Sequence, residues 1–515
     1  MTIKLSLLWR LFLGVILLIP ISSVSANLSV LGKNQHVWYQ KSASEAFEES
    51  SKTQKPVFLY WGAAWCPTCN VLKDAVFNQP KFPELMSALI PVYLDGDTEE
   101  AQTWSDKLKT VGYPTILIIA PGGKELARVS GSLDIEEFEQ VINQAVASQG
   151  ITQVITQALN NKLAPEAWKQ LAYLDWISHY QNTHGEQKTV DTALQLLENF
   201  PSSLPLEKSV LQLNTLSWVM QWEKTNSLST TTQNLIKKQV PFWLQNAFAS
   251  KDTAFANRYF ITREAQSTSQ YLNYQAKQPA YEALKKRWIQ SSQQLAIHPK
   301  ADTYTRMWSV SPLIDFALFE NPNQLPNKAI KQRVIEQVKQ SEEAVNNRYE
   351  SHFITVEGAK LLALVGDDAA AEALLKRGLK TTKTPWYLQS KIANLRAKQG
   401  DISGALEWSE KARESSQGRA TRLQWIATDI QMTAKYFAKP LKTRLLNLVD
   451  DYFKQAFALN DGFSGRNYIR SKTMIEALQK VSAQVPELNQ KFASLQKQCN
   501  AYSATAACQQ YFAQW

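Results

Sequence analysis

The chain has 515 residues, of which 44% are hydrophobic and 20% charged, and this composition excludes a disordered protein. Its length predicts about three domains, or one domain joined to an extended array. The formal net charge is +10, but residues 27–148 carry 10 basic and 15 acidic side chains, whereas residues 149–515 carry 44 and 31. The basic charges of the second part are scattered, which favours solvated helix faces and argues against nucleic-acid binding. We expect the two oppositely charged parts to touch in a salt-sensitive way.

Residues 1–26 have the pattern of a secretory signal peptide. Lys4 and Arg10 precede an apolar run that ends at Ile19, and small residues continue to Ala26. The run is shorter than the 18 or so residues that span a bilayer, which argues against an uncleaved anchor. We therefore expect cleavage after Ala26 and export to a bacterial periplasm, where disulfides are stable.

Residues 27–148 alternate between predicted helices and strands. Four short apolar runs predict strands, at residues 55–61, 89–95, 114–120 and 125–131. Amphipathic stretches predict helices at residues 42–54, 69–78, 98–110 and 134–148. A βαβ unit followed by a hairpin and a helix predicts one compact α/β domain.

The stretch "YWGAAWCPTCN" places Cys66 and Cys69 between a predicted strand and a predicted helix. At that turn the unpaired N–H groups and the positive end of the helix dipole stabilise a thiolate on Cys66. Pro67 suits the first helical position because it has no N–H to leave unpaired. Cys69 lies about one turn in and can resolve a mixed disulfide formed by Cys66. These features predict a redox-active pair with an exposed first sulfur.

Zinc binding is the main alternative for this motif. A structural zinc site needs about four ligands, but the other two cysteines lie at least 430 residues away and His36 precedes a different element. A static disulfide between Cys66 and Cys69 is also disfavoured, because an exposed first sulfur favours exchange. We predict no metal and no cofactor.

The motif "WCPTC" after a strand, together with "VGYPT" before the next strand, resembles the thioredoxin superfamily over residues 36–148. The surrounding sequence is most similar to periplasmic thioredoxin-like proteins and to the C-terminal domain of DsbD-type reductases. The resemblance implies a thiol-disulfide oxidoreductase that acts on protein disulfides and is supplied by a membrane electron donor. It also implies a cis bond before Pro114 and a substrate groove formed by Trp65, Pro67, Tyr113 and Pro114.

The sequence departs from that family in two ways. Tyr60 occupies the place of the buried aspartate six residues before the first cysteine, and the strand "LIPVYLD" contains no lysine. Water or a carboxylate such as Asp95 therefore remains as the proton acceptor of the resolving thiol. Pro67 and Thr68 bring no positive charge between the cysteines, so we expect a reductant or an isomerase and not a strong oxidant.

The second part of the chain reads as mostly helical and contains an internal repeat. Gly366 and Asp367 recur as Gly400 and Asp401, an offset of 34 residues that resembles the tetratricopeptide repeat over residues 352–418. Two repeats seldom form a stable array, so we expect flanking helices to stack on them as a degenerate solenoid. Whether these helices bind a partner protein or only fill space stays open. A rival reading of the whole chain is a scaffold whose thioredoxin-like part only docks.

Cys499 and Cys508 lie in a polar stretch of small residues near the C-terminus. An oxidising compartment and an eight-residue gap predict a structural disulfide between them. A second redox station for the first cysteine pair is the alternative.

Overall fold

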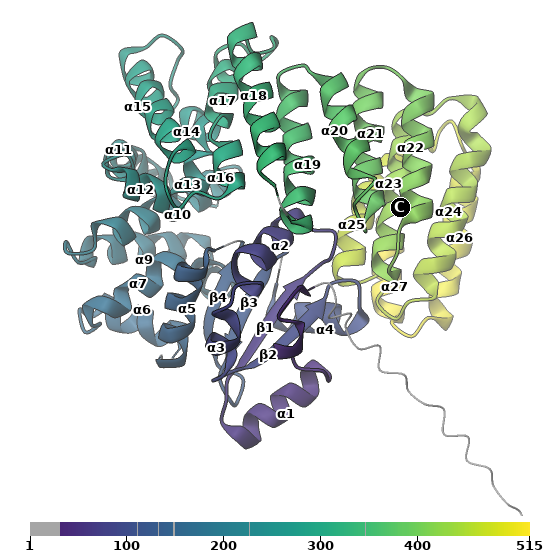
Figure 1. The fold of residues 1–515 in the computed structure, drawn as a ribbon. Coiled ribbons are helices and arrows are strands. Elements are labelled where there is room, and N and C mark those ends of the chain that lie inside the picture. Colours follow the sequence, from purple (N-terminus) through teal and green to yellow (C-terminus); the bar gives the residue numbers. More distant parts are fainter. Residues whose placement is uncertain (1–30, 111, 132, 148–149, 226, 346) are drawn as a thin grey trace, which may run out of the picture.

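The computed structural model describes residues 31–515 except residues 111, 132, 148–149, 226 and 346, so the expected signal peptide lies outside the described residues. A small sheet domain is followed by a long array of helices (Figure 1). The predicted combination of an α/β domain and a mostly helical region is thus confirmed. Among the helices that the structure describes, none has the length and apolar character needed to cross a bilayer.

The sheet has four strands in the order β2-β1-β3-β4. Strands β1 and β2 pair in parallel, whereas β1 with β3 and β3 with β4 are antiparallel. Their bounds are β1 (Val57–Gly62), β2 (Ile90–Asp95), β3 (Thr115–Ile119) and β4 (Glu125–Ser130). Strands β2, β3 and β4 lie within the segments that their apolar patterns predict, and β1 extends one residue beyond its predicted segment, to Gly62. The patterns are apolar throughout because both faces of this sheet are buried.

Helices cover both faces of the sheet. Val57, Leu59 and Trp61 of β1 pack toward α1 and α4, while Phe58 and Tyr60 pack toward the opposite set of helices. The alternation follows from the two-residue period of a strand. The helices of this domain are α1 (Ala43–Thr53), α2 (Pro67–Leu72), its π-helical continuation η3 (Lys73–Phe77), α3 (Phe82–Met86), α4 (Glu99–Leu108) and α5 (Ile135–Ala147), after a 3₁₀ turn η2 (Gln35–Val37).

The helical array follows α5 without a further described strand. Its first half contains α6 (Ile151–Leu159), α7 (Pro165–Tyr173), α8 (Trp176–His184), α9 (Glu186–Asn199), α10 (Pro205–Glu223), α11 (Thr230–Ala247), α12 (Lys251–Ala256), α13 (Arg258–Ile261), α14 (Ala265–Tyr271), α15 (Pro279–Ala296), α16 (Thr303–Trp308) and α17 (Ser311–Glu320). Its second half contains α18 (Lys328–Ala344), α19 (Arg348–Leu364), α20 (Asp368–Gly378), α21 (Pro385–Lys398), α22 (Ile402–Ser415), α23 (Arg419–Lys435), η4 (Lys439–Leu441), α24 (Lys442–Phe457), α25 (Gly465–Val481), α26 (Glu487–Gln498), η5 (Cys499–Ala501) and α27 (Thr505–Phe512).

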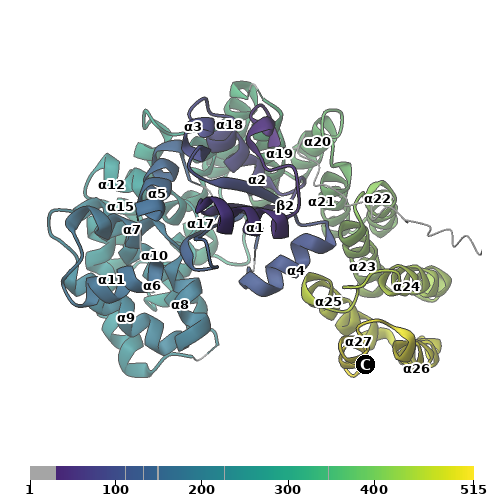
Figure 2. The same cartoon turned by 90° about the horizontal axis from the view of Figure 1, so that it is seen from below.

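The array curves around the sheet domain as an arc (Figures 1 and 2). Helices α6 and α8 contact β4, α19 packs on α2, and α25 packs on α4. The two parts of opposite charge therefore touch, and their pairs include Arg258 with Glu137 (2.8 Å) and Lys300 with Glu136 (2.5 Å). The salt sensitivity of this contact stays a prediction.

The repeated Gly-Asp pairs lie at equivalent turns of two neighbouring helical hairpins, α19–α20 and α21–α22. Gly366 and Gly400 have φ values of +72° and +81°, a region that favours glycine. Asp367 and Asp401 cap the following helices by accepting from the backbone N–H three residues on. The 34-residue offset thus reflects a repeated hairpin, while membership of the tetratricopeptide family stays a prediction.

Candidate functional site: a covered dithiol

Cys66 occupies the N-cap of α2. Its sulfur accepts a hydrogen bond from the Cys69 backbone N–H (3.3 Å), and Pro67 takes the first helical position, as its chemistry favours. Both cysteines are free thiols, and Cys69 has no exposed surface. This places the two sulfurs at the end of β1 in the arrangement expected from the motif.

The second motif lies opposite the cysteines. The Tyr113–Pro114 peptide bond is cis, as the family resemblance implies. The Cys66 thiol lies 3.8 Å from the Tyr113 carbonyl oxygen, and the Tyr113 ring contacts Trp61 and Trp65 with centroid distances of 4.1 and 5.7 Å. The structure therefore brings Trp65, Tyr113 and Cys66 together, while substrate binding by these residues stays a prediction.

A buried lysine, absent from the sequence-based prediction, lies next to the two cysteines. Lys73 is 1% exposed, and burial lowers the pKa of its ammonium group, while the charges of Cys69, Cys66 and Asp95 oppose that change. Burial and the neighbouring Asp97 raise the pKa of Asp95 to about 6. The expected strand lysine is indeed missing from β2, but the helix supplies a cation from the other side. The spacing of four residues between Cys69 and Lys73 would have indicated a shared helix face.

The two sulfurs differ in their acidity because they differ in their contacts. Burial raises the pKa of the Cys66 thiol well above its usual value, and the Cys69 amide and Lys73 only partly oppose this rise. Burial also acts on Cys69, but its contacts with the Cys66 thiol and with Lys73 bring its pKa below the usual value.

Tyr60 replaces the buried carboxylate of the family. The side chain has no exposed surface and stacks on Tyr93 at a centroid distance of 5.3 Å. Its contact with the Cys69 thiol lowers the pKa of that thiol, and burial raises the pKa of Tyr60 itself. A Cβ atom on Gly62 would lie 2.3 Å from the Tyr60 hydroxyl oxygen, so glycine is required where this ring passes. A neutral phenol thus borders the Cys69 thiol.

Three helices of the array cover the cysteine pair. Trp386 and Tyr387 of α21 and Trp425 of α23 form a cluster with Cys66 and Cys69, and the ring of Tyr387 stacks on Trp65 at 6.1 Å. As a result Cys66 is 5% exposed. The expectation of an exposed first sulfur is wrong, because residues more than 300 positions away cover it. We call these aromatic residues, together with Arg466 of α25, the cover.

Polar contacts hold the cover in place. Trp65 donates from Nε1 to the Thr421 hydroxyl (3.1 Å), and Thr421 in turn donates to Asp97. Arg466 donates to the Gly96 carbonyl (2.9 Å), and its guanidinium lies over the rings of Trp65 and Tyr113 at 5.3 and 5.6 Å. These contacts join the turn between β1 and α2, which carries Trp65 and Cys66 and which we call the redox turn, to α23 and α25.

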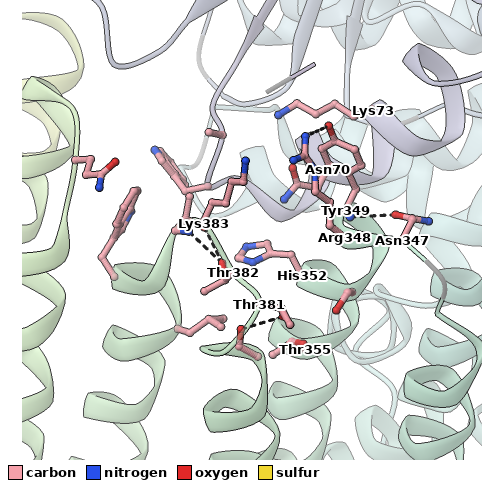
Figure 3. Close-up of a pocket in the computed structure, with 18 of the residues that line it drawn as sticks. Asn70, Lys73, Asn347, Arg348, Tyr349, His352, Thr355, Thr381, Thr382 and Lys383 are labelled. Atoms are coloured by element: carbon pink, nitrogen blue, oxygen red, sulfur yellow. Dashed lines mark hydrogen bonds between the residues drawn. The ribbon is translucent and has the colours of Figure 1, made fainter. Parts of the chain in front are cut away.

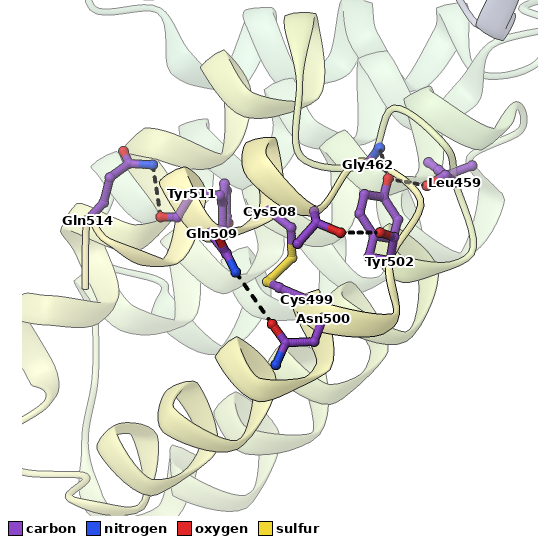
Figure 4. Close-up of a disulfide and its surroundings, with 10 residues drawn as sticks. Leu459, Gly462, Cys499, Asn500, Tyr502, Cys508, Gln509, Tyr511 and Gln514 are labelled. Atoms are coloured by element: carbon purple, nitrogen blue, oxygen red, sulfur yellow. Dashed lines mark hydrogen bonds between the residues drawn. A yellow bond between two sulfur atoms is a disulfide. The ribbon is translucent and has the colours of Figure 1, made fainter.

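Cys499 and Cys508 form a disulfide with a Cα–Cα distance of 5.5 Å (Figure 4). The bond joins η5 to α27, and both residues lie inside an apolar cluster with Phe463, Tyr511 and Phe512. Neither cysteine has exposed surface. Figure 4 places this disulfide among helices at the C-terminal end of the array.

Within the described part of the chain, His, Cys, Asp and Glu side chains do not gather in threes at a geometry that holds a metal ion. The prediction of no cofactor remains a prediction.

A strand-to-helix dithiol opposite a cis-proline defines a thioredoxin-like domain. Residues 37–121 match the family described as thioredoxin-like, so the N-terminal domain belongs to the thioredoxin superfamily. The chain is 30% identical over 129 residues to thiol:disulfide interchange protein DsbD 1 of Pseudomonas aeruginosa. The aligned region covers 24% of this chain and 21% of that protein. It is also 30% identical over 93 residues to DsbD of Pectobacterium atrosepticum, covering 17% and 16%.

A thioredoxin structure from Thermus thermophilus is similar with 25% identity, covers 22% of this chain and 88% of that chain, and has a TM-score of 0.20. The chain spans about a fifth of the length of the curated relatives that it matches. The matched region and its relatives support a function in thiol-disulfide chemistry.

Proposed function

We propose that this protein is an exported thiol-disulfide oxidoreductase that reduces or isomerises disulfides through Cys66 and Cys69. The observation that carries the proposal is the position of the Cys66 sulfur. It accepts from the Cys69 amide at 3.3 Å at the start of α2 and lies 3.8 Å from the carbonyl of Tyr113, beside the cis bond. A helix N-terminus and an amide donor are the features that stabilise a reactive thiolate.

The reaction proceeds in two exchanges. The Cys66 thiolate attacks one sulfur of a substrate disulfide, forms a mixed disulfide and releases the other substrate sulfur as a thiolate. The Cys69 thiolate then attacks the Cys66 sulfur, releases the second substrate thiol and leaves a Cys66–Cys69 disulfide. Two electrons pass to the substrate in reduction. In isomerisation a substrate thiolate displaces Cys66 instead, and no net electron transfer occurs.

Lys73 and Tyr60 assist Cys69 in the second exchange. Both lower the pKa of the Cys69 thiol, which increases the fraction of thiolate available for attack. Lys73 is a positioning residue in this scheme because it acts through the sulfur and not on the substrate. Asp95, with a pKa of about 6, is the nearby carboxylate able to exchange a proton near neutral pH.

The reductive direction requires a dithiol donor that reduces the Cys66–Cys69 disulfide. A membrane donor of the DsbD type is the partner class that the similarity favours. The equilibrium potential of the full mature chain against glutathione buffers tests the direction. A value near or below about −200 mV supports a reductant, and one near −120 mV, the range of a strong oxidant, overturns it.

A second candidate function is a periplasmic scaffold in which the array binds a partner and the thioredoxin-like domain only docks. The 5% exposure of Cys66 beneath the cover favours this alternative, because a folded substrate has no direct path to the sulfur. Reduction of insulin by the purified protein with dithiothreitol separates the two. Turnover above the dithiothreitol background supports the oxidoreductase, and its absence in a correctly folded sample supports the scaffold.

A further inference from the structure

A cavity of about 700 Å³ lies between the redox turn and the array. Its walls come from Trp65, Asn70 and Lys73 on the sheet domain, from α19, and from the connection between α20 and α21 (Figure 3). Trp65 and Trp386 belong both to these walls and to the cluster around Cys66. The cavity therefore ends one side chain away from the reactive sulfur, and its volume is within the range of small-molecule sites.

Lys73 places a buried ammonium group in the wall of this cavity, which favours an anionic ligand. The side chain is 1% exposed, and among the described residues it forms neither an ion pair nor a hydrogen bond. The ring of Tyr349 lies 5.9 Å from the ammonium nitrogen. An ammonium group that is buried without a counter-ion is costly, so an anion in the cavity would relieve that cost.

The acidic residues in the walls, Asp95 and Asp97, do not form an ion pair with Lys73. Asp97 pairs with Arg466 (3.4 Å) and accepts from Thr421, and Asp95 accepts from the Asp97 amide (3.1 Å). Neither forms an ion pair with the Lys73 nitrogen within 4 Å, so when the two cysteines are uncharged thiols Lys73 has no paired counter-ion among the described residues.

The remaining walls suit a polar ligand of peptide character. They present Ser351, Thr355, Thr381 and Thr382 to the cavity, and the basic side chains of Arg348 and Lys383 also line it (Figure 3). Two more wall residues keep unused hydrogen-bonding atoms, namely Nε2 of His352 and Nε1 of Trp386, which have no partner among the described residues. Buried polar atoms of this kind are usually satisfied in a folded protein, so they point to a bound ligand.

We propose that this cavity binds a small anionic peptide disulfide of about tripeptide size, with a carboxylate against Lys73 and a sulfur directed toward Cys66. The proposal rests on the proposed function and deepens it by naming a substrate class. Cys66 does not itself line the cavity, but its neighbour Trp65 does, and the cover lies over the sulfur, so a free small molecule fits this space better than a loop of a folded protein.

The chemistry is the exchange already described. The Cys66 thiolate attacks one sulfur of the peptide disulfide and releases one peptide thiol. Cys69 then attacks the Cys66 sulfur, releases the second peptide thiol and forms the Cys66–Cys69 disulfide. Two thiols of the protein are oxidised and one disulfide of the ligand is reduced.

Binding is tested without turnover by calorimetry of the full mature chain with S-methylglutathione, which carries the tripeptide and its carboxylates but cannot exchange. We expect saturable 1:1 binding, weakened at least tenfold in Lys73→Met, which keeps the buried stem. Lys339→Met, which removes an exposed lysine, serves as the matched control and should bind as the wild type does. The amide form of the probe, which lacks the negative charges, should bind at least tenfold more weakly to the wild type.

If Lys73→Met fails to fold, Thr382→Val and Lys383→Gln in the cavity wall replace it, with circular dichroism as the check of folding. Absence of saturable binding, or equal binding to the Lys73 and Lys339 variants, overturns the proposal. Insulin reduction is measured in the same samples. A chain that reduces insulin but does not bind the probe refutes the cavity site and leaves the proposed function intact, whereas binding without reduction of any disulfide refutes the proposed function and the ligand's role as a substrate.

Discussion

The two cysteine pairs of this chain lie in opposite kinds of surroundings. Cys66 and Cys69 are free thiols, three positions apart at the start of α2, next to the buried ionisable groups of Lys73 and Tyr60. Cys499 and Cys508 are bonded across nine positions, inside a cluster of aromatic rings. All four cysteines are buried, so burial alone does not distinguish the pairs.

The neighbouring charges make the difference. A thiolate must be stabilised to exchange, and Lys73 and the Cys69 amide provide this stabilisation for the first pair. The second pair lies in a cluster of apolar and aromatic side chains, which suits an uncharged disulfide better than a thiolate. The reactivity proposed for the first pair thus rests on local electrostatics and not on spacing alone.

The largest expected effect comes from removing the sulfurs of the first pair. Cys66→Ser should abolish exchange, whereas Cys69→Ser should still attack and then accumulate mixed disulfides, because nothing resolves them. Insulin reduction and mass spectrometry of the trapped adducts measure the two outcomes. Thr68→Ser, between the cysteines, should keep activity and serves as the control. Preferential alkylation of Cys69 by limiting reagent would contradict this assignment.

Removing the second pair should affect stability and spare the chemistry. The double variant Cys499→Ser, Cys508→Ser should lose about 2 to 3 kcal/mol of unfolding free energy, because the unfolded chain regains the freedom that the ring removes. Thermal and urea unfolding give the loss, and insulin reduction per folded molecule should match the wild type. A loss of activity at unchanged stability would instead make this pair a redox relay.

Much of the sheet domain could be predicted because its signals are local. The apolar run of β1 and the turn before Cys66 act within a few residues, so the strands follow from short patterns, while the cis bond follows from the resemblance carried by the motif around Pro114. The burial of Lys73 beside the cysteines could not be predicted, for a different reason. Its register on the helix is readable, but its burial depends on α19 packing over α2.

The cover could not be predicted from the sequence. Trp65 and Thr421 are 356 positions apart, and no local pattern indicates that α23 returns to the redox turn. The same holds for Arg466, whose partners lie on the sheet domain and on a neighbouring helix. Contacts of this range depend on how successive hairpins curve, which is a property of the whole array.

Replacing Asp95 should change the pH dependence of stability by an intermediate amount. Burial and Asp97 raise its pKa to about 6 in the folded protein, above a value of about 4 in the unfolded chain. A raised pKa gives stability that is present below about pH 4 and is lost as the pH rises through about 6. Asp95→Asn should therefore be more stable than the wild type by about 1 to 2 kcal/mol at pH 7.5, and equal to it near pH 4.

Urea unfolding between pH 4 and 7.5 measures this difference. Glu48→Gln, at an exposed carboxylate of α1, is the control and should show little change at any pH. A constant difference between the Asp95 variant and the wild type across the range would show that packing, not charge, governs this site.

The smallest expected effect comes from loosening the cover. Arg466 is 8% exposed and donates to the Gly96 carbonyl (2.9 Å) and to Gln424 (2.6 Å), while its guanidinium lies over Trp65. Arg466→Ala removes these contacts, and a shift of about 1.4 kcal/mol toward the open arrangement corresponds to a tenfold larger open population. Alkylation of Cys66 by N-ethylmaleimide should therefore become roughly tenfold faster.

Arg466→Ala also distinguishes two effects of the cover, one on access of reagent to Cys66 and one on the pKa of its thiol. Burial beneath the cover raises the pKa of the Cys66 thiol, so a looser cover should also move the alkylation profile to lower pH. Arg377→Ala, which removes an exposed ion pair with Glu342 on the array, should leave both the rate and the profile unchanged. A faster rate with an unshifted profile would mean that the cover only blocks access, and an unchanged rate would mean that Arg466 does not hold it closed. A shift of both would assign the covering helices control over the reactivity of Cys66, whereas the second cysteine pair is already bonded inside an apolar cluster.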